Sequence, residues 1–118
     1  VGVLLKDVTV EHAGNLVVLE GGHTYMSQKI KKDGIEGLKA GKFPGIPKDG
    51  SLTPKPILGK AGDLIISHYL TPHAIDNNLT ENIRYAVYFR VTAPSHEVGS
   101  RKVADLWRDF GGPAGWKN

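Results

Sequence analysis

The segment RYAVYFRV, residues 84–91, constrains the fold of this chain more than any other stretch. It is rich in β-branched and aromatic residues, which suit a pleated and half-buried surface, and it therefore predicts a strand. Side chains alternate along a strand, so one face would carry Arg84, Ala86, Tyr88 and Arg90. The opposite face, with residues 85, 87, 89 and 91, is more apolar, and we expect it to meet a helix. The first face is semi-polar, as the inside of a ligand-holding barrel would be.

Other apolar runs predict further strands within residues 1–10, 15–20 and 64–67. Two turn signals separate them from later segments, Gly62-Asp63 and Asp76-Asn77-Asn78. Asn and Asp tolerate left-handed backbone and bond to their own main chain, which favours tight turns. We expect such a turn to join two adjacent strands and to bring His73 and Arg84 side by side.

Helical patterns are short. Thr24 is expected to cap a helix over residues 25–32, and Ser100 a second helix over residues 101–110 that packs outside a sheet. Residues 33–61 are rich in Gly, Pro and Lys and predict a long loop. Several strands broken by turns, with little helix, predict a mainly β fold, a sandwich or barrel with peripheral helices.

The chain has 118 residues, which is enough for one domain with a modest core. It begins at Val1 inside a strand-like run, so we expect it to be part of a longer parent protein. It has no cysteine, which excludes disulfides and thiolate metal sites. There is neither a signal-peptide pattern nor an apolar run long enough to span a bilayer, so a cytoplasmic protein without a membrane partner is expected.

The positive charge is concentrated in one region. The net charge is +3, and residues 29–60 contain eight lysines against three acidic residues. This variable lysine-rich loop could be a solvated surface or a docking face for an anionic ligand, including a polyanion. Aromatic residues are not interleaved with these lysines, so we expect no nucleic-acid partner.

His73 and Arg84 are the candidate site residues. His73 alone could be a structural histidine or a metal ligand. An arginine that points into a cavity needs an anion, and a planar carboxylate can be held by two parallel hydrogen bonds. The two residues together favour a metal ligand beside an anion-binding site.

Residues 62–91 resemble the C-terminal half of the phytanoyl-CoA dioxygenase-like family of Fe(II)/2-oxoglutarate-dependent oxygenases. The most diagnostic feature is a histidine followed eleven residues later by an arginine, here His73 and Arg84. Residues 15–23, NLVVLEGGH, are similar to the family segment that ends in Pro-Gly-Ser-His, with Glu20 and Gly22 in place of the Pro and the Ser. Residues 106–109 are similar to the end of bacterial members.

The resemblance implies a double-stranded β-helix, a jelly-roll or cupin-like barrel, present here in incomplete form over residues 1–118. It implies that His73 is the distal histidine of a two-histidine, one-carboxylate iron site. Arg84 would hold the far carboxylate of the co-substrate 2-oxoglutarate, with ascorbate as a reductant. The parent protein would be a dioxygenase that hydroxylates a small-molecule substrate, for which an anionic group is one option.

One departure from the family is clear. The family supplies its other two iron ligands as His-x-Asp, and this sequence contains neither His-x-Asp nor His-x-Glu. We expect these ligands upstream of Val1, and expect the 118-residue chain alone to be inactive. His12, His23, His68 and His96 form no convincing triad with His73, and we assign His23 and His68 structural roles. The alternative is a non-catalytic β-helix module for binding or assembly, which could form a homodimer through open sheet edges.

Overall fold

The computed structural model describes residues 1–34, 47, 49–92 and 94. In these residues the chain is mainly β, with one helix, as the sequence predicted. In chain order the elements are β1 (Gly2–Leu4), β2 (Leu16–Leu19), α1 (Gly22–Asp33), β3 (Pro54–Ile57), β4 (Leu64–Ile65), β5 (His73–Ile75) and β6 (Ala86–Tyr88).

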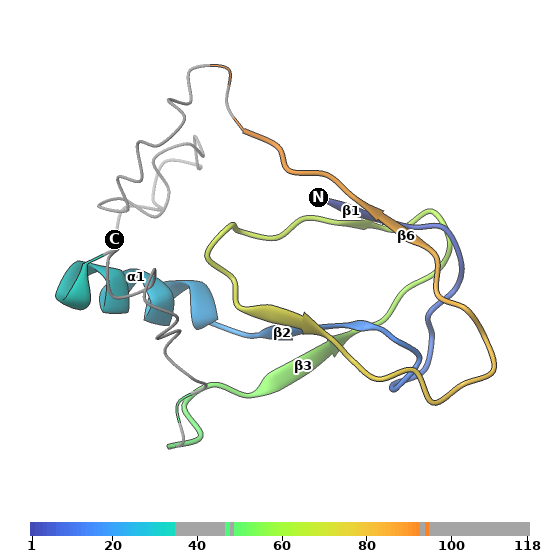
Figure 1. The fold of residues 1–118 in the computed structure, drawn as a ribbon, viewed down its shortest axis with the longest axis horizontal. Coiled ribbons are helices and arrows are strands. Elements are labelled where there is room, and N and C mark those ends of the chain that lie inside the picture. Colours follow the sequence, from blue (N-terminus) through green and yellow to red (C-terminus); the bar gives the residue numbers. More distant parts are fainter. Residues whose placement is uncertain (35–46, 48, 93, 95–118) are drawn as a thin grey trace.

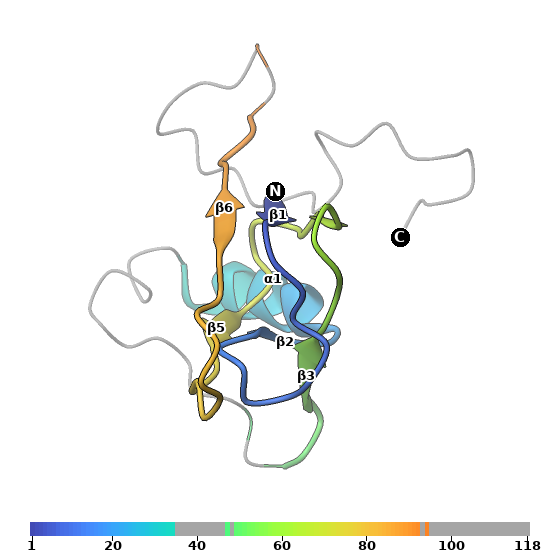
Figure 2. The same cartoon turned by 90° about the vertical axis from the view of Figure 1, so that its right-hand side faces the viewer.

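The strands form two three-stranded antiparallel sheets, ordered β4-β1-β6 and β3-β2-β5. Figures 1 and 2 show them as two layers. The pairing is nested: β2 pairs with β3 and β1 with β4, so residues 2–65 make one long hairpin that passes through both layers. An isolated bridge between Val8 and Gly59 continues this hairpin between the sheets. β5 and β6 then pair with the other sides of β2 and β1.

The expectation that the strands of His73 and Arg84 lie side by side was wrong. β5 pairs with β2 and β6 pairs with β1, so the two strands belong to different sheets. The turn signal at residues 76–78 is real, because Asn77 N–H is bonded by the Asp76 carboxylate and Thr80 N–H by Asn78 Oδ1. A turn signal reports a local change of direction, and here the chain crosses from one sheet to the other.

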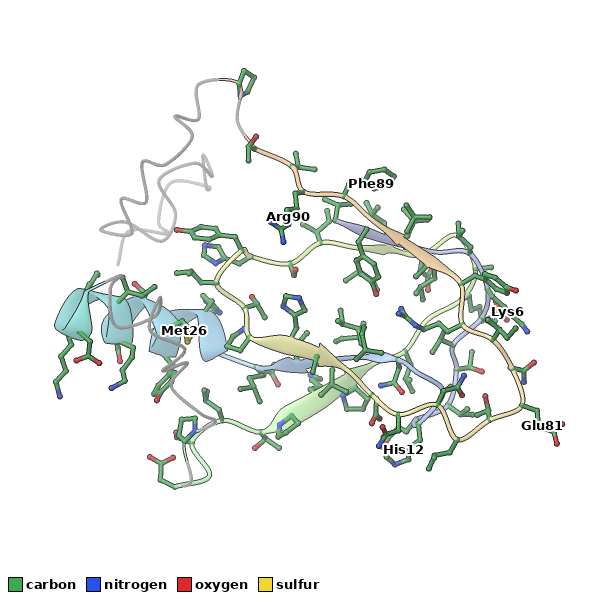
Figure 3. The ribbon with its side chains drawn as sticks, in the orientation of Figure 1. Lys6, His12, Met26, Glu81, Phe89 and Arg90 are labelled. Carbon is green, nitrogen blue, oxygen red and sulfur yellow. The ribbon has the colours of Figure 1, made fainter. Side chains whose placement is uncertain are left out.

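The predicted alternation on β6 is present, although the strand is shorter than residues 84–91. Backbone hydrogen bonds beyond the strand join Leu5 to Tyr85 and Val1 to Phe89. Figure 3 shows Phe89 pointing away from the other layer and Arg90 pointing toward it. The outer face is exposed, with Phe89 56% accessible, so the helix of the described residues, α1, does not cover it. The helix predicted over residues 101–110 lies outside the described residues.

Helix α1 begins earlier than predicted, and Thr24 is not its cap. The N-cap residue is Gly21, in left-handed backbone with φ 73°, and it provides no side-chain hydrogen bond. Its carbonyl accepts the N–H of Thr24 instead. Glycine is suited to this position because it adopts positive φ without steric cost. The helix buries Met26, Ser27 and Ile30.

A strand also lies within the predicted loop of residues 33–61. β3 contains Pro54 and Pro56, two residues that lowered the strand signal of this segment. Proline lacks the N–H needed in a ladder and is tolerated at a sheet edge. β3 is such an edge, with its only partner β2 in the described residues.

The apolar core of the described residues is small. Its buried side chains come from both sheets and from the helix: Leu4, Val8, Leu16, Leu19, Met26 and Ile30. No helix in the described ranges is long and apolar enough to cross a membrane.

Candidate functional site

Arg84 lies just before β6, on the side of the strand that faces the other layer. Its Nη1 donates a hydrogen bond to the hydroxyl of Tyr88 at 2.9 Å. The guanidinium carbon is 5.8 Å from the centre of the Tyr88 ring. The contact confirms that these two residues share one face. In residues 1–34, 47, 49–92 and 94, no carboxylate is paired with Arg84. A half-buried guanidinium without a negative partner is suited to binding an anion.

The position of the Tyr88 ring depends on Gly2, its direct partner across the β1–β6 ladder. A Cβ atom added to Gly2 would lie 2.7 Å from Tyr88 Cε1 and 2.9 Å from Cδ1. Both distances are shorter than real Cβ contacts, so any other residue at position 2 would displace the ring. The ring therefore lies against the β1 backbone, and its hydroxyl reaches back to Arg84.

The connection before Arg84 is held by two features. Gly14, whose φ of 70° favours glycine, lies beside both residues: an added Cβ would be in ordinary contact with them, 3.4 Å from Asn78 and 3.8 Å from Arg84. Asn78 Nδ2 donates to the carbonyl of Asn82 at 2.7 Å, and its Oδ1 accepts from Thr80. The prediction that Asn78 shapes this turn is confirmed. The turn fixes where the chain enters β6 and thus where Arg84 lies.

His73 opens β5 in the other sheet and is paired with Val18. Directly paired residues of an antiparallel ladder project to the same face. His73 therefore shares the face of Val18 and, two residues along β2, of the buried Leu16. Its Nδ1 lies 2.9 Å from the carbonyl oxygen of Thr71. A carbonyl can only accept, so Nδ1 carries the proton and Nε2 keeps a lone pair. This is the tautomer and the second contact typical of a metal-binding histidine.

His68 has the opposite tautomer. Its Nδ1 accepts the N–H of Leu70 at 3.1 Å, so a neutral ring has its proton on Nε2. The ring also lies 4.4 Å, centre to centre, from that of Tyr69. The predicted packing and hydrogen-bonding role of His68 is confirmed.

His23 and His68 come together although 45 positions separate them in the sequence. Their ring centres are 5.6 Å apart, with an angle of 50° between the planes. Burial, and secondly the proximity of His68, lower the pKa of His23 below its ordinary value. Sequence analysis missed this approach, because nothing in the local pattern indicates which distant loop packs on the start of α1.

The described residues do not form a complete metal site. They contain no cluster of three or more histidine, aspartate or glutamate side chains placed to hold one ion. His12, another candidate in the sequence, instead pairs through Nδ1 with the carboxylate of Asp76 at 3.0 Å. His96 lies outside the described residues. His73 is thus a single candidate ligand in this part of the structure.

Two lysines of the lysine-rich region form ion pairs in the described residues. Lys29 pairs with Asp33 at 2.8 Å and Lys55 with Glu20 at 3.3 Å. Lysines 39, 42 and 48 lie outside the described residues. These pairs weaken the case for a polyanion surface made by the described lysines.

Searches with this chain against protein-family models, curated proteins and solved structures gave no match.

Proposed function

We propose that this chain is part of an Fe(II)- and 2-oxoglutarate-dependent dioxygenase of the phytanoyl-CoA dioxygenase-like type. The observation that carries the proposal is the Arg84–Tyr88 pair, a half-buried arginine that has no carboxylate partner in the described residues and shares the face of Arg90, which points toward the other layer. His73, on the face of the other sheet that carries Leu16, adds an imidazole with its Nε2 lone pair available.

The strand order supports a double-stranded β-helix. In a jelly roll, a long hairpin passes through two facing sheets, and the strands that follow it pair with the strands of its first arm. The nested pairing of β1 with β4 and β2 with β3, followed by β5 and β6 beside β2 and β1, has this arrangement. A complete roll has eight strands, and two more would fit beside the edges of β5 and β6 that are unpaired in the described residues.

The residues present fit a carboxylate. Arg84 offers a planar pair of N–H donors, which matches the two oxygens of the far carboxylate of 2-oxoglutarate. Arg84 lies just before β6 and is held by its hydrogen bond to Tyr88. It would therefore hold the co-substrate against the inner face of this sheet.

The described residues do not by themselves fit iron, because one histidine is too few ligands to hold the ion. In the proposed protein, His73 would complete a facial triad whose other two ligands come from outside the described residues. Bound iron would supply the oxidative decarboxylation of 2-oxoglutarate and the hydroxylation of a C–H bond. The contribution of His73 itself is an imidazole held by Thr71 in the ligand tautomer.

The test is succinate formation from 2-oxoglutarate, with Fe(II) and ascorbate, by this chain joined to its natural upstream sequence. We expect turnover that His73→Ala abolishes and that Arg84→Gln weakens through the KM for 2-oxoglutarate. His12→Asn is the matched control, since His12 is engaged with Asp76 and asparagine tolerates its left-handed backbone, φ 56°. Full turnover after His73→Ala, or no turnover in the joined protein, would exclude the proposal.

A non-catalytic binding or assembly module is the second candidate. It is favoured by the edges of β5 and β6, which have no second partner strand in the described residues, and by the exposed apolar side chains near them, among them Ile75 at 53%. Free strand edges can pair with another chain, including a second copy. Sedimentation of the purified chain separates the two: a dimer that binds neither iron nor 2-oxoglutarate would favour the module.

A further inference from the structure

Arg84 is not the only polar group directed at the proposed carboxylate site. The hydroxyl of Tyr88 accepts a hydrogen bond from Arg84 Nη1 through one of its lone pairs. A phenol has both a donor and acceptor capacity, so its own proton is still available. In the described residues, no hydrogen-bond acceptor is recorded for that proton.

Tyr88 is also accessible to a ligand. Its side chain is 47% exposed, although it shares the inward face with the half-buried Arg84. The ring cannot move toward β1, because Gly2 already lies in contact with it. In the structure the ring packs on β1 and presents its hydroxyl beside the guanidinium.

We infer that Tyr88 is a second carboxylate-binding residue, which donates its hydroxyl proton to the anion held by Arg84. The Arg84–Tyr88 hydrogen bond has two consequences. It withdraws electron density from the phenol oxygen, which makes that group a stronger donor, and it fixes the plane of the guanidinium. The site then offers an N–H pair and one O–H to a single planar carboxylate. This inference rests on the proposed function, since it assigns a role in binding the same 2-oxoglutarate carboxylate.

The geometry also bears on selectivity among ligands. A site built from a fixed guanidinium plane and one phenol matches a flat, two-oxygen group. It should reject 2-oxo acids that lack the distal carboxylate, because the guanidinium and the phenol would then be left without a partner.

The experiment measures binding of 2-oxoglutarate to the 118-residue chain by calorimetry, comparing Tyr88→Phe with the wild type. Phenylalanine keeps the ring on Gly2 and removes only the hydroxyl. A hydrogen bond to a charged group typically supports at least a tenfold effect, so we expect affinity to fall on the order of tenfold. The control is Tyr85→Phe, which removes a phenol hydroxyl from the opposite face of the same strand and should change nothing.

The possible results separate the two ideas. Weaker binding by Tyr88→Phe and Arg84→Gln, with Tyr85→Phe unchanged, supports the inference. Binding lowered by Arg84→Gln and unaffected by Tyr88→Phe would overturn the role of Tyr88 and leave the proposed function standing. Absence of binding by the wild type, or binding that Arg84→Gln does not alter, would overturn the carboxylate site of Arg84 and Tyr88, while succinate formation by the joined protein decides the proposed function separately. Far-ultraviolet circular dichroism establishes that each variant is folded.

A second measurement excludes a purely structural effect of the hydroxyl. Binding of 2-oxobutanoate, which lacks the distal carboxylate, is compared in the wild type and in Tyr88→Phe. We expect Tyr88→Phe to remove most of the preference of the wild type for 2-oxoglutarate. An equal preference in both proteins would contradict a direct contact between Tyr88 and the carboxylate.

Discussion

Gly2 lies directly beneath the ring of Tyr88, so close that a Cβ on Gly2 would stand 2.7 Å from Cε1. The contact joins the first strand of the chain to the last described one and determines where the Tyr88 hydroxyl meets Arg84. A glycine in the middle of a strand is ordinarily a cost in stability. Here the missing side chain allows the ring of Tyr88 to pack directly on the backbone of β1.

Gly2→Ala should therefore displace the ring of Tyr88 and break its hydrogen bond to Arg84. The ring is partly exposed and can rotate, so we expect a stability loss of only about 0.5–1.5 kcal/mol. Affinity for 2-oxoglutarate should fall as it does for Tyr88→Phe. Calorimetric titration and chemical denaturation measure the two effects.

Gly62→Ala is the matched control for that substitution. Gly62 has φ 95° and no atom within 4 Å of an added Cβ, so alanine there strains only the backbone. We expect a stability loss of about 1–2 kcal/mol with unchanged affinity. If Gly62→Ala weakened binding as much as Gly2→Ala, the effect would be one of general destabilisation.

Local sequence patterns predicted the strands better than their partners. Alternation in residues 84–91 indicated that Arg84 and Tyr88 share one face, and their contact confirms it. The pairing of β6 with β1 joins residues more than 80 positions apart, and no local pattern specifies such a partner. For the same reason, a turn between β5 and β6 was mistaken for a hairpin within one sheet.

The helix start was missed for a related reason. Thr24 looks like a cap in the sequence, and Gly21-Gly22 looks like a break. Tertiary packing decided otherwise, because Gly22 lies against Pro72 of a distant loop and no larger residue would fit. The left-handed backbone of Gly21 then turns the chain directly from β2 into α1.

The packing of Gly22 makes a second prediction. Alanine normally stabilises a helix relative to glycine by up to about 1 kcal/mol. At Gly22, however, the new Cβ would lie 2.6 Å from Pro72 Cδ and 3.1 Å from Leu19 Cβ. A proline ring cannot swing aside, so we expect overpacking to dominate and Gly22→Ala to lose about 1–3 kcal/mol in urea denaturation. Thr24→Ala, on the same turn but exposed, should change stability by less than about 0.5 kcal/mol. A stabilised Gly22→Ala would show that the loop at Pro72 is free to move.

At Ser27, in contrast to Gly22, we expect substitution by alanine to stabilise the protein. Ser27 is 1% exposed, and its hydroxyl has no hydrogen-bond partner among the residues that the structure describes. An unsatisfied buried hydroxyl costs free energy, and alanine is also the better helix former. Ser27→Ala should therefore raise the free energy of unfolding, by about 0.5–2 kcal/mol. Ser27→Val, which is larger and β-branched, is the overpacked comparison and should be less stable than Ser27→Ala. A loss of stability in Ser27→Ala would mean that the hydroxyl makes a bond in solution.

The contact of His23 with His68 predicts how stability depends on pH. The pKa of His23 is lowered in the folded protein, first by burial and then by His68. Below its ordinary value of about 6.5, the unfolded chain binds a proton that the folded protein resists. The contribution of His23 to the free energy of unfolding should be constant above about pH 6.5. Below that pH, the free energy of unfolding should fall until the pH reaches the pKa of His23 in the folded protein.

Two variants separate the causes of that fall. His23→Gln removes the titrating group, so its denaturation midpoint should depend less on pH between 6.5 and the folded pKa than that of the wild type. His68→Gln removes only the second cause, so the pKa of His23, followed by NMR of its ring protons, should rise part of the way to its ordinary value. Burial is the larger cause, and a full return to the ordinary pKa in His68→Gln would therefore contradict the order of the two effects.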